Sequence, residues 1–352
     1  MGSKRDSKGA SPVASRQQAV AAGTFCALLT AAGAASAQVT LTISSWVPPD
    51  HAITTSQADW CAEITKATSG RVKCNILAKT VAPPGKVFDA ITDGLGDVSF
   101  DVHGYTPGRF KLTGLVELPF LGDSAEASSV AYQKVYEKHL AKFNEHRALK
   151  VLSVFTHGPG IIMNSKRPLT KLADLDGLKF RVGGGIVNDI GKALGLNVTL
   201  RPASQSYEML SSGVMDGTFF PAESVASFKL EKLIKYRTEF PGGLYNTSFA
   251  MVMNQATWEK ISKADQAAIE KLSGESYARR VGRAWDKADR GGAALMQANG
   301  VEVTKASPAF VEEVRAKTSG LENKAINDAN AAGLTNAAEV LKEYRALLAA
   351  SK

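Results

Sequence analysis

Hydrophobic and polar residues alternate along several short segments in the first half of the chain, a pattern typical of strands. Between these segments the hydrophobic residues recur at helical spacing. The expected strands cover residues 39–45, 71–77, 98–102 and 149–155. The expected helices cover residues 54–70, 83–97 and 128–146. Strands that take turns with helices predict an α/β fold with helices on both faces of a sheet.

The same rhythm starts again after residue 160 and predicts a second α/β unit. Its expected strands are 178–182 and 197–200, and its expected helices are 186–195, 204–213 and 223–235. A further strand is expected at 247–254, after this unit. From Thr257 the chain reads as almost entirely helical, apart from a short strand at 300–304. Because no Pro- or Ser-rich linker separates the units, we expect the chain to cross between two lobes more than once. The expected lobes are 38–160 plus about 247–290, and 161–246 plus about 291–352.

The first 37 residues have the pattern of a secretory signal sequence. Four basic residues come first, a run of small apolar residues follows, and the segment ends in Ala35-Ser36-Ala37. This order matches the n-region, h-region and cleavage site of an exported protein. A membrane anchor is the alternative, although the run is mostly Ala and Gly. We expect cleavage before Gln38 and a periplasmic protein that is not embedded in the membrane.

Export changes how the charges and cysteines are interpreted. The chain carries a net charge of +8, of which residues 1–37 supply +3, which leaves +5 on the exported part. A scattered excess of this size does not predict nucleic-acid binding. Cys61 and Cys74 remain after cleavage, and an oxidising compartment favours a disulfide between them. Free thiols are the alternative.

The sequence gives little support to an enzyme. Its five histidines show no HExxH spacing, and no GxSxG motif is present. His157, in a loop between the expected lobes, is the one histidine that could act as a base, although loop histidines more often have a structural role. No cofactor and no metal are expected.

The segment from Gly177 to Gly195 contains three consecutive glycines between a strand and a helix. It lacks the third glycine of the dinucleotide motif, because Asn188 stands at that position. The glycines can still permit a close backbone approach and open a helix whose free N–H groups attract an anion. Arg181 stands just before them, and its guanidinium matches a carboxylate with two hydrogen bonds. A structural salt bridge is the alternative role for Arg181.

Several ordered motifs resemble the solute-binding proteins of tripartite ATP-independent periplasmic (TRAP) transporters. They are GLKFRVGGG with the preceding LTKLADLDG, the later SYEMLSSGVMDGTFFPAES, and the earlier GDVSFDVHGYTPGRF. The resemblance runs from about Val39 to the helical tail. It implies two α/β lobes with hinge strands, a long helix across both, and closure over a small organic acid. It also implies that the family's carboxylate-binding arginine is Arg181.

The sequence departs from sialic-acid-binding members of that family, which carry a Glu-Asn pair where this chain has Phe219-Phe220 before Pro221. The resemblance therefore implies that Phe220 forms a wall of the ligand site, with Phe219 as a second candidate. Trp46, at the end of the first strand, is expected to form the opposite wall. Core packing is the alternative for these aromatic residues. Weaker candidates for ligand contact are His157, Tyr105, Tyr207 and Asn246.

These observations predict a periplasmic binding protein for a small organic monocarboxylate, favouring an aromatic or branched 2-oxo or 2-hydroxy acid. Its expected partners are that acid and the membrane permease subunits of a TRAP transporter. A periplasmic enzyme or a ligand sensor acting on the same acids is the alternative.

Overall fold

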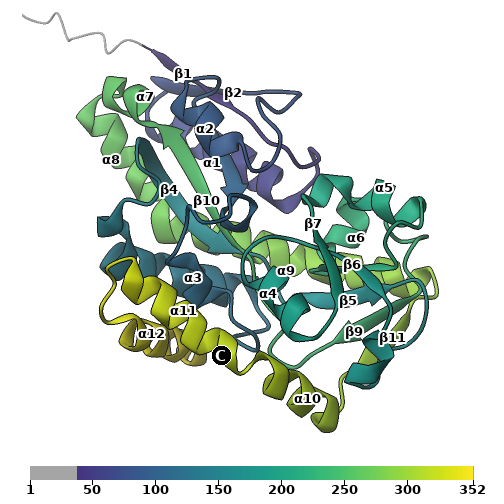
Figure 1. The fold of residues 1–352 in the computed structure, drawn as a ribbon. Coiled ribbons are helices and arrows are strands. Elements are labelled where there is room, and N and C mark those ends of the chain that lie inside the picture. Colours follow the sequence, from purple (N-terminus) through teal and green to yellow (C-terminus); the bar gives the residue numbers. More distant parts are fainter. Residues whose placement is uncertain (1–37, 352) are drawn as a thin grey trace, which may run out of the picture. The chain divides into compact units, whose positions relative to one another are not determined.

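A computed structural model describes residues 38–351 of the chain. The predicted signal sequence, residues 1–37, lies outside the described residues. Two separate β-sheets organise the described part, and helices pack around both of them (Figure 1). The predicted α/β fold with two lobes is confirmed.

The first sheet has the strand order β2-β1-β3-β10-β4. Strands β1, β2 and β3 run parallel, whereas β10 is antiparallel to both β3 and β4. The central strands β3 and β10 are buried along their whole length, as expected where helices cover both faces. The strands are β1 (Val39–Ile43), β2 (Val72–Ile76), β3 (Val98–Val102), β4 (Leu149–Thr156) and β10 (Ser248–Asn254).

The second sheet has the order β11-β9-β5-β8-β6-β7. The sequence pattern did not predict β5, β8 or β9, because each has only four residues and shows no alternation. The expected helix 223–235 is likewise only one short helix, followed by turns and β9. The strands are β5 (Ile161–Asn164), β6 (Lys179–Val182), β7 (Asn197–Leu200), β8 (Gly217–Phe220), β9 (Tyr236–Glu239) and β11 (Glu302–Lys305).

Helices around the first sheet are capped by the residues that normally begin helices. Ser124 caps α3 by accepting from the Ala127 N–H, and Asn254 caps α7 by accepting from the Thr257 N–H. The helices in this part are α1 (Ala52–Ala67), α2 (Val87–Thr92), α3 (Ala125–Val135), α7 (Gln255–Lys260) and α8 (Lys263–Leu272). The helices around the second sheet are α4 (Ile186–Ala193), α5 (Ser206–Ser211) and α6 (Glu223–Ser227).

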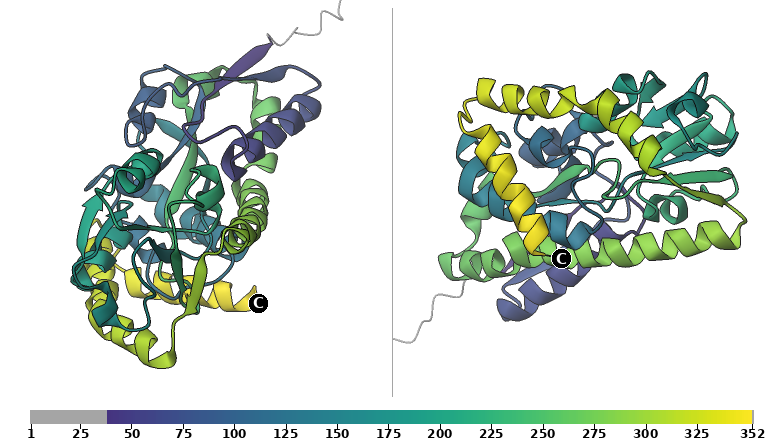
Figure 2. Two further views of the ribbon diagram at one scale, coloured as in Figure 1. Left: turned by 90° about the vertical axis from the view of Figure 1, so that its right-hand side faces the viewer. Right: turned by 90° about the horizontal axis from the view of Figure 1, so that it is seen from below.

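One long helix, α9 (Gly274–Ala298), contacts elements of both sheets. It packs against α1, α3 and β4 of the first group and against α6 of the second (Figure 2). Glycines allow two of these contacts, because a Cβ at Gly282 would overlap Glu126 and one at Gly292 would overlap Ala222. A 25-residue helix is about 37 Å long, so α9 spans both lobes.

The C-terminal helices return toward the first sheet. Helix α10 (Pro308–Thr318) contacts α4, whereas α12 (Ala337–Ala350) packs against α3. Helix α11 (Gly320–Ala331) lies between them and contacts both α4 and α12. The sequence-based boundary placed the whole tail with the second lobe, but α12 packs on a helix of the first.

Two connecting segments pair with each other between the sheets. The Gly160 N–H donates to the Tyr245 carbonyl at 2.8 Å, and the Leu244 N–H donates back to the Gly160 carbonyl at 2.9 Å. Segments 157–160 and 240–247 therefore form a short antiparallel pair where the chain crosses between the lobes. Within residues 38–351, no helix combines enough length and apolar character to cross a bilayer.

A disulfide joins Cys61 in α1 to Cys74 in β2, with a Cα–Cα distance of 6.0 Å. The two cysteines are 13 residues apart, and closing a loop of this size constrains the unfolded chain. Cys61 also packs among the hydrophobic residues of the first lobe.

Reduction of this disulfide is expected to lower the free energy of unfolding by about 3 kcal/mol, because the unfolded chain regains conformational freedom. Urea unfolding of the exported chain with and without a reductant measures the difference. A Cys61→Ala/Cys74→Ala double variant is the control, since its stability should not respond to the reductant. Equal midpoints for the oxidised and reduced wild-type protein would contradict this expectation.

Candidate ligand-binding site

A small cavity lies where the two lobes meet, beside the crossover segments. Its volume is about 40 Å³, several times the space that one water molecule needs. Both lobes contribute to its wall, which includes Tyr105 from the first and Arg181 from the second. Seven aromatic side chains line the cavity, namely Trp46, Tyr105, Phe220, Phe228, Tyr245, Phe249 and Trp285.

Arg181 supplies the positive charge of this cavity. It lies on β6 and is 1% exposed, with its guanidinium carbon 4.3 Å from the centre of the Phe220 ring. Its Nε and Nη2 atoms donate to the Arg201 carbonyl at 2.9 and 2.6 Å. Within residues 38–351, no carboxylate forms an ion pair with Arg181, and its Nη1 atom has no hydrogen-bond partner. The structural salt bridge considered as an alternative is therefore not formed by the described residues.

Tyr105 brings a hydroxyl group from the first lobe to this guanidinium. Its oxygen accepts from Arg181 Nη2 at 3.3 Å and from the Ala203 N–H at 3.0 Å. Burial raises the pKa of Tyr105 above its usual value, so the phenol keeps its proton. Because the oxygen already accepts two hydrogen bonds, its own hydrogen can be donated to a third group.

The aromatic walls come from both lobes. Trp46 follows β1 and donates its Nε1–H to the Phe100 carbonyl at 3.2 Å, which fixes the indole plane. Phe220 ends β8 and stacks on Phe228 with ring centres 5.7 Å apart. A flat apolar group between such rings makes large contact area with little loss of side-chain freedom.

His51 and Glu223 join the lobes beside the cavity. His51 Nδ1 accepts from the Ile53 N–H at 3.1 Å, so Nε2 carries the proton and donates to Glu223 Oε1 at 3.2 Å. Both side chains are 3% exposed. Burial lowers the pKa of His51, so the imidazole is neutral at pH 7 and the pair is a hydrogen bond between a neutral ring and a carboxylate.

His157 lies on the cavity wall at the crossover. Its Nδ1 atom is 2.5 Å from the Gly158 carbonyl oxygen, which can only accept, so Nδ1 carries the proton. Burial lowers the pKa of His157 to about 4, and the ring is therefore neutral at pH 7. Its ring packs edge-on to Tyr245 with centres 5.2 Å apart.

The glycine run makes a close contact between the lobes. A Cβ at Gly184 would overlap the carbonyl oxygen of Gly104, and a Cβ at Gly104 would overlap the Gly184 carbonyl group. Gly104 belongs to the first lobe and Gly184 to the second. Only glycine at both positions permits this approach, so the run serves lobe contact rather than phosphate binding.

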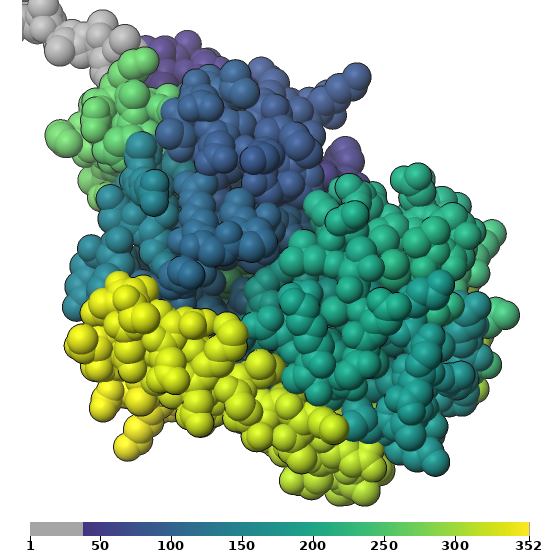
Figure 3. Space-filling model, viewed as in Figure 1, coloured from purple at the N-terminus to yellow at the C-terminus, as the bar shows by residue number. Residues whose placement is uncertain are grey.

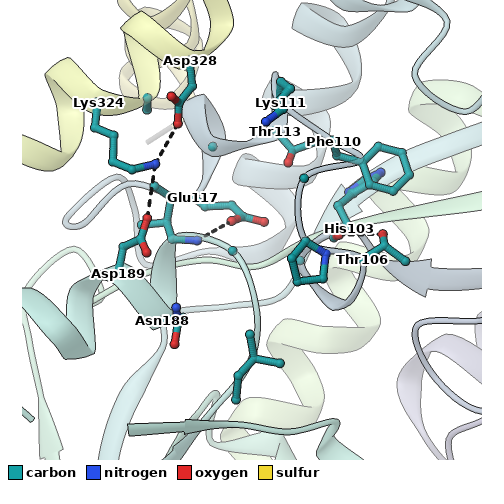
Figure 4. A pocket seen from close by; sticks show the side chains of 18 residues that line it. His103, Thr106, Phe110, Lys111, Thr113, Glu117, Asn188, Asp189, Lys324 and Asp328 are labelled. Atoms are coloured by element: carbon teal, nitrogen blue, oxygen red, sulfur yellow. Dashed lines mark hydrogen bonds and ion pairs between the residues drawn. The ribbon is translucent and has the colours of Figure 1, made fainter. Parts of the chain in front are cut away.

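The N-terminus of α4 holds an anion, and that anion is a side chain of the protein. Glu117 Oε2 accepts from the Ile186 N–H at 3.1 Å, while Oε1 accepts from the Ser248 N–H and hydroxyl (Figure 4). Burial raises the pKa of Glu117 to about 6, which leaves it mainly ionised at pH 7. Glu117 therefore links the first lobe to the second.

Glu117 also borders a wider groove of about 300 Å³ on the other side of the glycine contact. Residues near 110, 188 and 325 meet around it on the face seen in Figure 3. Its charged groups are largely paired with one another, since Lys324 lies 2.7 Å from Asp328 and 3.5 Å from Asp189 (Figure 4). Within residues 38–351, no cluster of three metal-ligating side chains is present.

Comparison with known proteins identifies the family. Residues 43–328 match the model of the family described as bacterial extracellular solute-binding protein, family 7, or DctP. The outer membrane transporter protein TsaT of Comamonas testosteroni is 29% identical over 89% of this chain and 93% of its own length. The chain belongs to the TRAP transporter solute-binding proteins.

Solved structures of TRAP solute-binding proteins superpose closely on this one. The protein from Bordetella bronchiseptica with bound (R)-mandelate and (S)-mandelate is 43% identical, with a TM-score of 0.87 over 89% of this chain and all of that one. A marine metagenome protein in complex with 3-hydroxybenzoate is 32% identical, with a TM-score of 0.82 over 89% of this chain and 99% of that one. The resemblance seen in the sequence is thus confirmed at the level of family and fold.

The structure brings together five of the residues predicted for the ligand site of this TRAP protein. They line one cavity and are Trp46, Tyr105, His157, Arg181 and Phe220. The three others are not on its wall. Phe219 points to the opposite face of β8 and packs on Phe180, and Tyr207 is 51% exposed on α5. Asn246 is buried at the crossover, where its amide nitrogen can donate to the Gly158 and Tyr245 carbonyls.

Other residues on the wall of this TRAP protein's cavity were not predicted. Tyr245 lies in an irregular segment, where no periodic pattern marks its side chain. His51 caps α1, and Trp285 lies on α9 more than 200 residues further along. Of these wall residues, only His51 could have been noticed in the sequence, because it stands where α1 begins. The positions of Tyr245 and Trp285 on the wall depend on how the two lobes pack together.

Gly184→Ala is expected to weaken ligand binding at least about tenfold while leaving each lobe folded, because the added methyl holds the lobes apart at Gly104. Calorimetric titration with mandelate measures the dissociation constant. Gly291→Ala is the matched control, since no atom lies within 4 Å of the added Cβ there and its affinity should not change. Wild-type affinity in Gly184→Ala would show that this contact does not limit closure.

Proposed function

We propose that this protein binds a small aromatic monocarboxylate between its lobes and delivers it to a TRAP permease. The observation that carries the proposal is the environment of Arg181. A buried guanidinium needs compensation, yet among residues 38–351 no carboxylate pairs with it. The carboxylate of a ligand completes the pair through Nη1 of Arg181 and the hydroxyl hydrogen of Tyr105.

The shape and composition of the cavity support an aromatic ligand. The walls on both sides of Arg181 are rings, and ring walls suit a ligand that is itself flat and apolar apart from its carboxylate. Two similar TRAP proteins were solved with mandelate and with 3-hydroxybenzoate, and both compounds are aromatic acids. Of the two kinds of monocarboxylate expected from the sequence, we therefore propose an aromatic acid rather than a branched one as the ligand.

Hinge closure is the mechanism we propose. The contacts that hold the lobes together are Tyr105 with Ala203, His51 with Glu223, and Glu117 with Ile186. Opening at the paired crossover segments breaks these hydrogen bonds and exposes Arg181 to water. A ligand that replaces this water favours the closed state because it binds that state better. The signal sequence supports a periplasmic location, where the closed form meets the permease.

We propose that the ligand leaves unchanged. His157 was the candidate base for the enzyme alternative, but a pKa of about 4 makes it a weak base at neutral pH. Its Nδ1–H is also committed to the Gly158 carbonyl. Chromatography of an aromatic acid after long incubation with the protein tests this point, and any turnover would favour the enzyme alternative.

Arg181→Lys is expected to weaken benzoate and mandelate binding at least about tenfold, because a single ammonium group cannot keep the bonds to the Arg201 carbonyl and also reach the ligand as the planar guanidinium does. Arg181→Ala should weaken it further, since loss of a buried charged partner costs roughly 2–5 kcal/mol. Titration calorimetry after unfolding and refolding, which removes carried-over ligand, gives the affinities. Arg201→Ala is the matched control, because its side chain is exposed and only its carbonyl contacts Arg181. Equal affinities for wild type and Arg181→Lys would refute the carboxylate clamp.

Phe220→Leu is expected to affect ligand binding and Phe219→Leu is expected to affect stability, because adjacent residues of β8 face opposite sides of the sheet. Phe220→Leu should weaken binding of aromatic acids several-fold with little change in stability. Phe219→Leu should lower the free energy of unfolding by about 1 kcal/mol, since that ring is fully buried in the core. Titration with benzoate and urea unfolding provide the two measurements. The aromatic wall would be excluded if Phe219→Leu lost more affinity than Phe220→Leu.

A further inference from the structure

The polar atoms on the cavity wall differ in what they offer to a ligand. Trp46 Nε1 is committed to the Phe100 carbonyl, and both ring nitrogens of His51 are committed to Ile53 and Glu223. Arg181 and Tyr105 have donors to spare for the carboxylate. The hydroxyl groups of other wall residues can donate or accept, so they do not select between ligands.

His157 Nε2 is different, because it can only accept. The Gly158 carbonyl fixes the ring proton on Nδ1, which leaves a lone pair on Nε2. Within residues 38–351, no group donates a hydrogen bond to Nε2. The ring lines the same small cavity as Arg181, so a ligand held by the guanidinium also lies against the imidazole.

We propose that His157 Nε2 accepts a hydrogen bond from a hydroxyl group of the ligand, so that the preferred cargo is a hydroxylated aromatic acid. This inference rests on the proposed function, since it assumes an aromatic acid held at Arg181. A ligand hydroxyl satisfies the lone pair, whereas a hydrocarbon ligand leaves it buried without a donor. A keto oxygen in the same place is worse, because it faces the lone pair with another acceptor.

The neighbours of His157 fix the orientation of its imidazole ring. Tyr245 and Trp285 pack against its ring, at centre distances of 5.2 and 5.9 Å. These contacts hold the imidazole in one orientation without using Nε2. The acceptor is therefore fixed before the ligand arrives, which gives selectivity at little cost in ordering.

The test compares ligands of nearly equal size by titration calorimetry. Wild-type protein is expected to bind mandelate about tenfold more tightly than phenylacetate, and to bind benzoylformate most weakly of the three. A second pair, 3-hydroxybenzoate and benzoate, measures whether a hydroxyl group on the ring also raises the affinity. A preference in either pair supports the proposal, and the pair that shows it tells where the hydroxyl lies. Equal affinities within both pairs would overturn it.

His157→Asn keeps the structural hydrogen bond, because its amide nitrogen can still donate to the Gly158 carbonyl. Its own acceptor, the amide oxygen, lies closer to the backbone than Nε2 does, so it is expected to fall short of the ligand hydroxyl. The preference for the hydroxylated acid is expected to shrink to within about twofold, while phenylacetate and benzoate keep their affinity. His157→Gln, which carries a carbonyl oxygen further from the backbone, should recover part of the preference. If His157→Asn weakened hydroxylated and plain acids equally, His157 would have only a structural role and the proposal would fail.

The failure of this inference can be told from failure of the proposed function. If the plain and hydroxylated acids bind equally, and Arg181→Lys weakens both, the aromatic-acid function stands and the hydroxyl selection is wrong. If no aromatic acid binds in a manner that depends on Arg181, the proposed function itself is wrong. Thermal unfolding of each variant without ligand checks that the fold is intact.

Discussion

The architecture of this protein depends on one buried positive charge. Arg181 sits behind aromatic rings, where a guanidinium loses its water and gains only a backbone carbonyl, a phenol and a ring face in return. Such an arrangement is tolerable when the lobes are open and water reaches the charge, or when they are closed around a ligand carboxylate. In the proposed mechanism, the two lobes pass between these two conditions by opening at the paired crossover and closing at the glycine contact.

Much of the fold could be predicted because it follows local rules. Alternation marked the strands of the first sheet, and Gly, Pro and Ser marked the helix ends. The strands β5, β8 and β9 were missed because four residues are too few to show a period. The return of α12 to α3 was missed because it depends on contacts between residues about 200 positions apart.

The candidate site divides in the same way. Arg181, Phe220 and Trp46 lie at or next to strand ends in motifs that resemble a known family, and all three line the cavity. Phe219 and Phe220 show the limit of sequence reasoning. Strand geometry predicts that the two side chains face opposite sides of the sheet, but it does not say which side faces the core and which faces the cavity. His51 and Glu117 come from two separate segments, and only the meeting of the lobes brings their atoms to Glu223 and Ile186.

Glu117 at the N-terminus of α4 has a consequence for which anions the protein can carry. A helix N-terminus beside a glycine run would attract phosphate from the surroundings if it were left open. Here the protein keeps its own carboxylate there, and a second anion would be repelled by that charge. An inorganic anion that approached the N-terminus of α4 would therefore meet a carboxylate that already fills the position where it would bind.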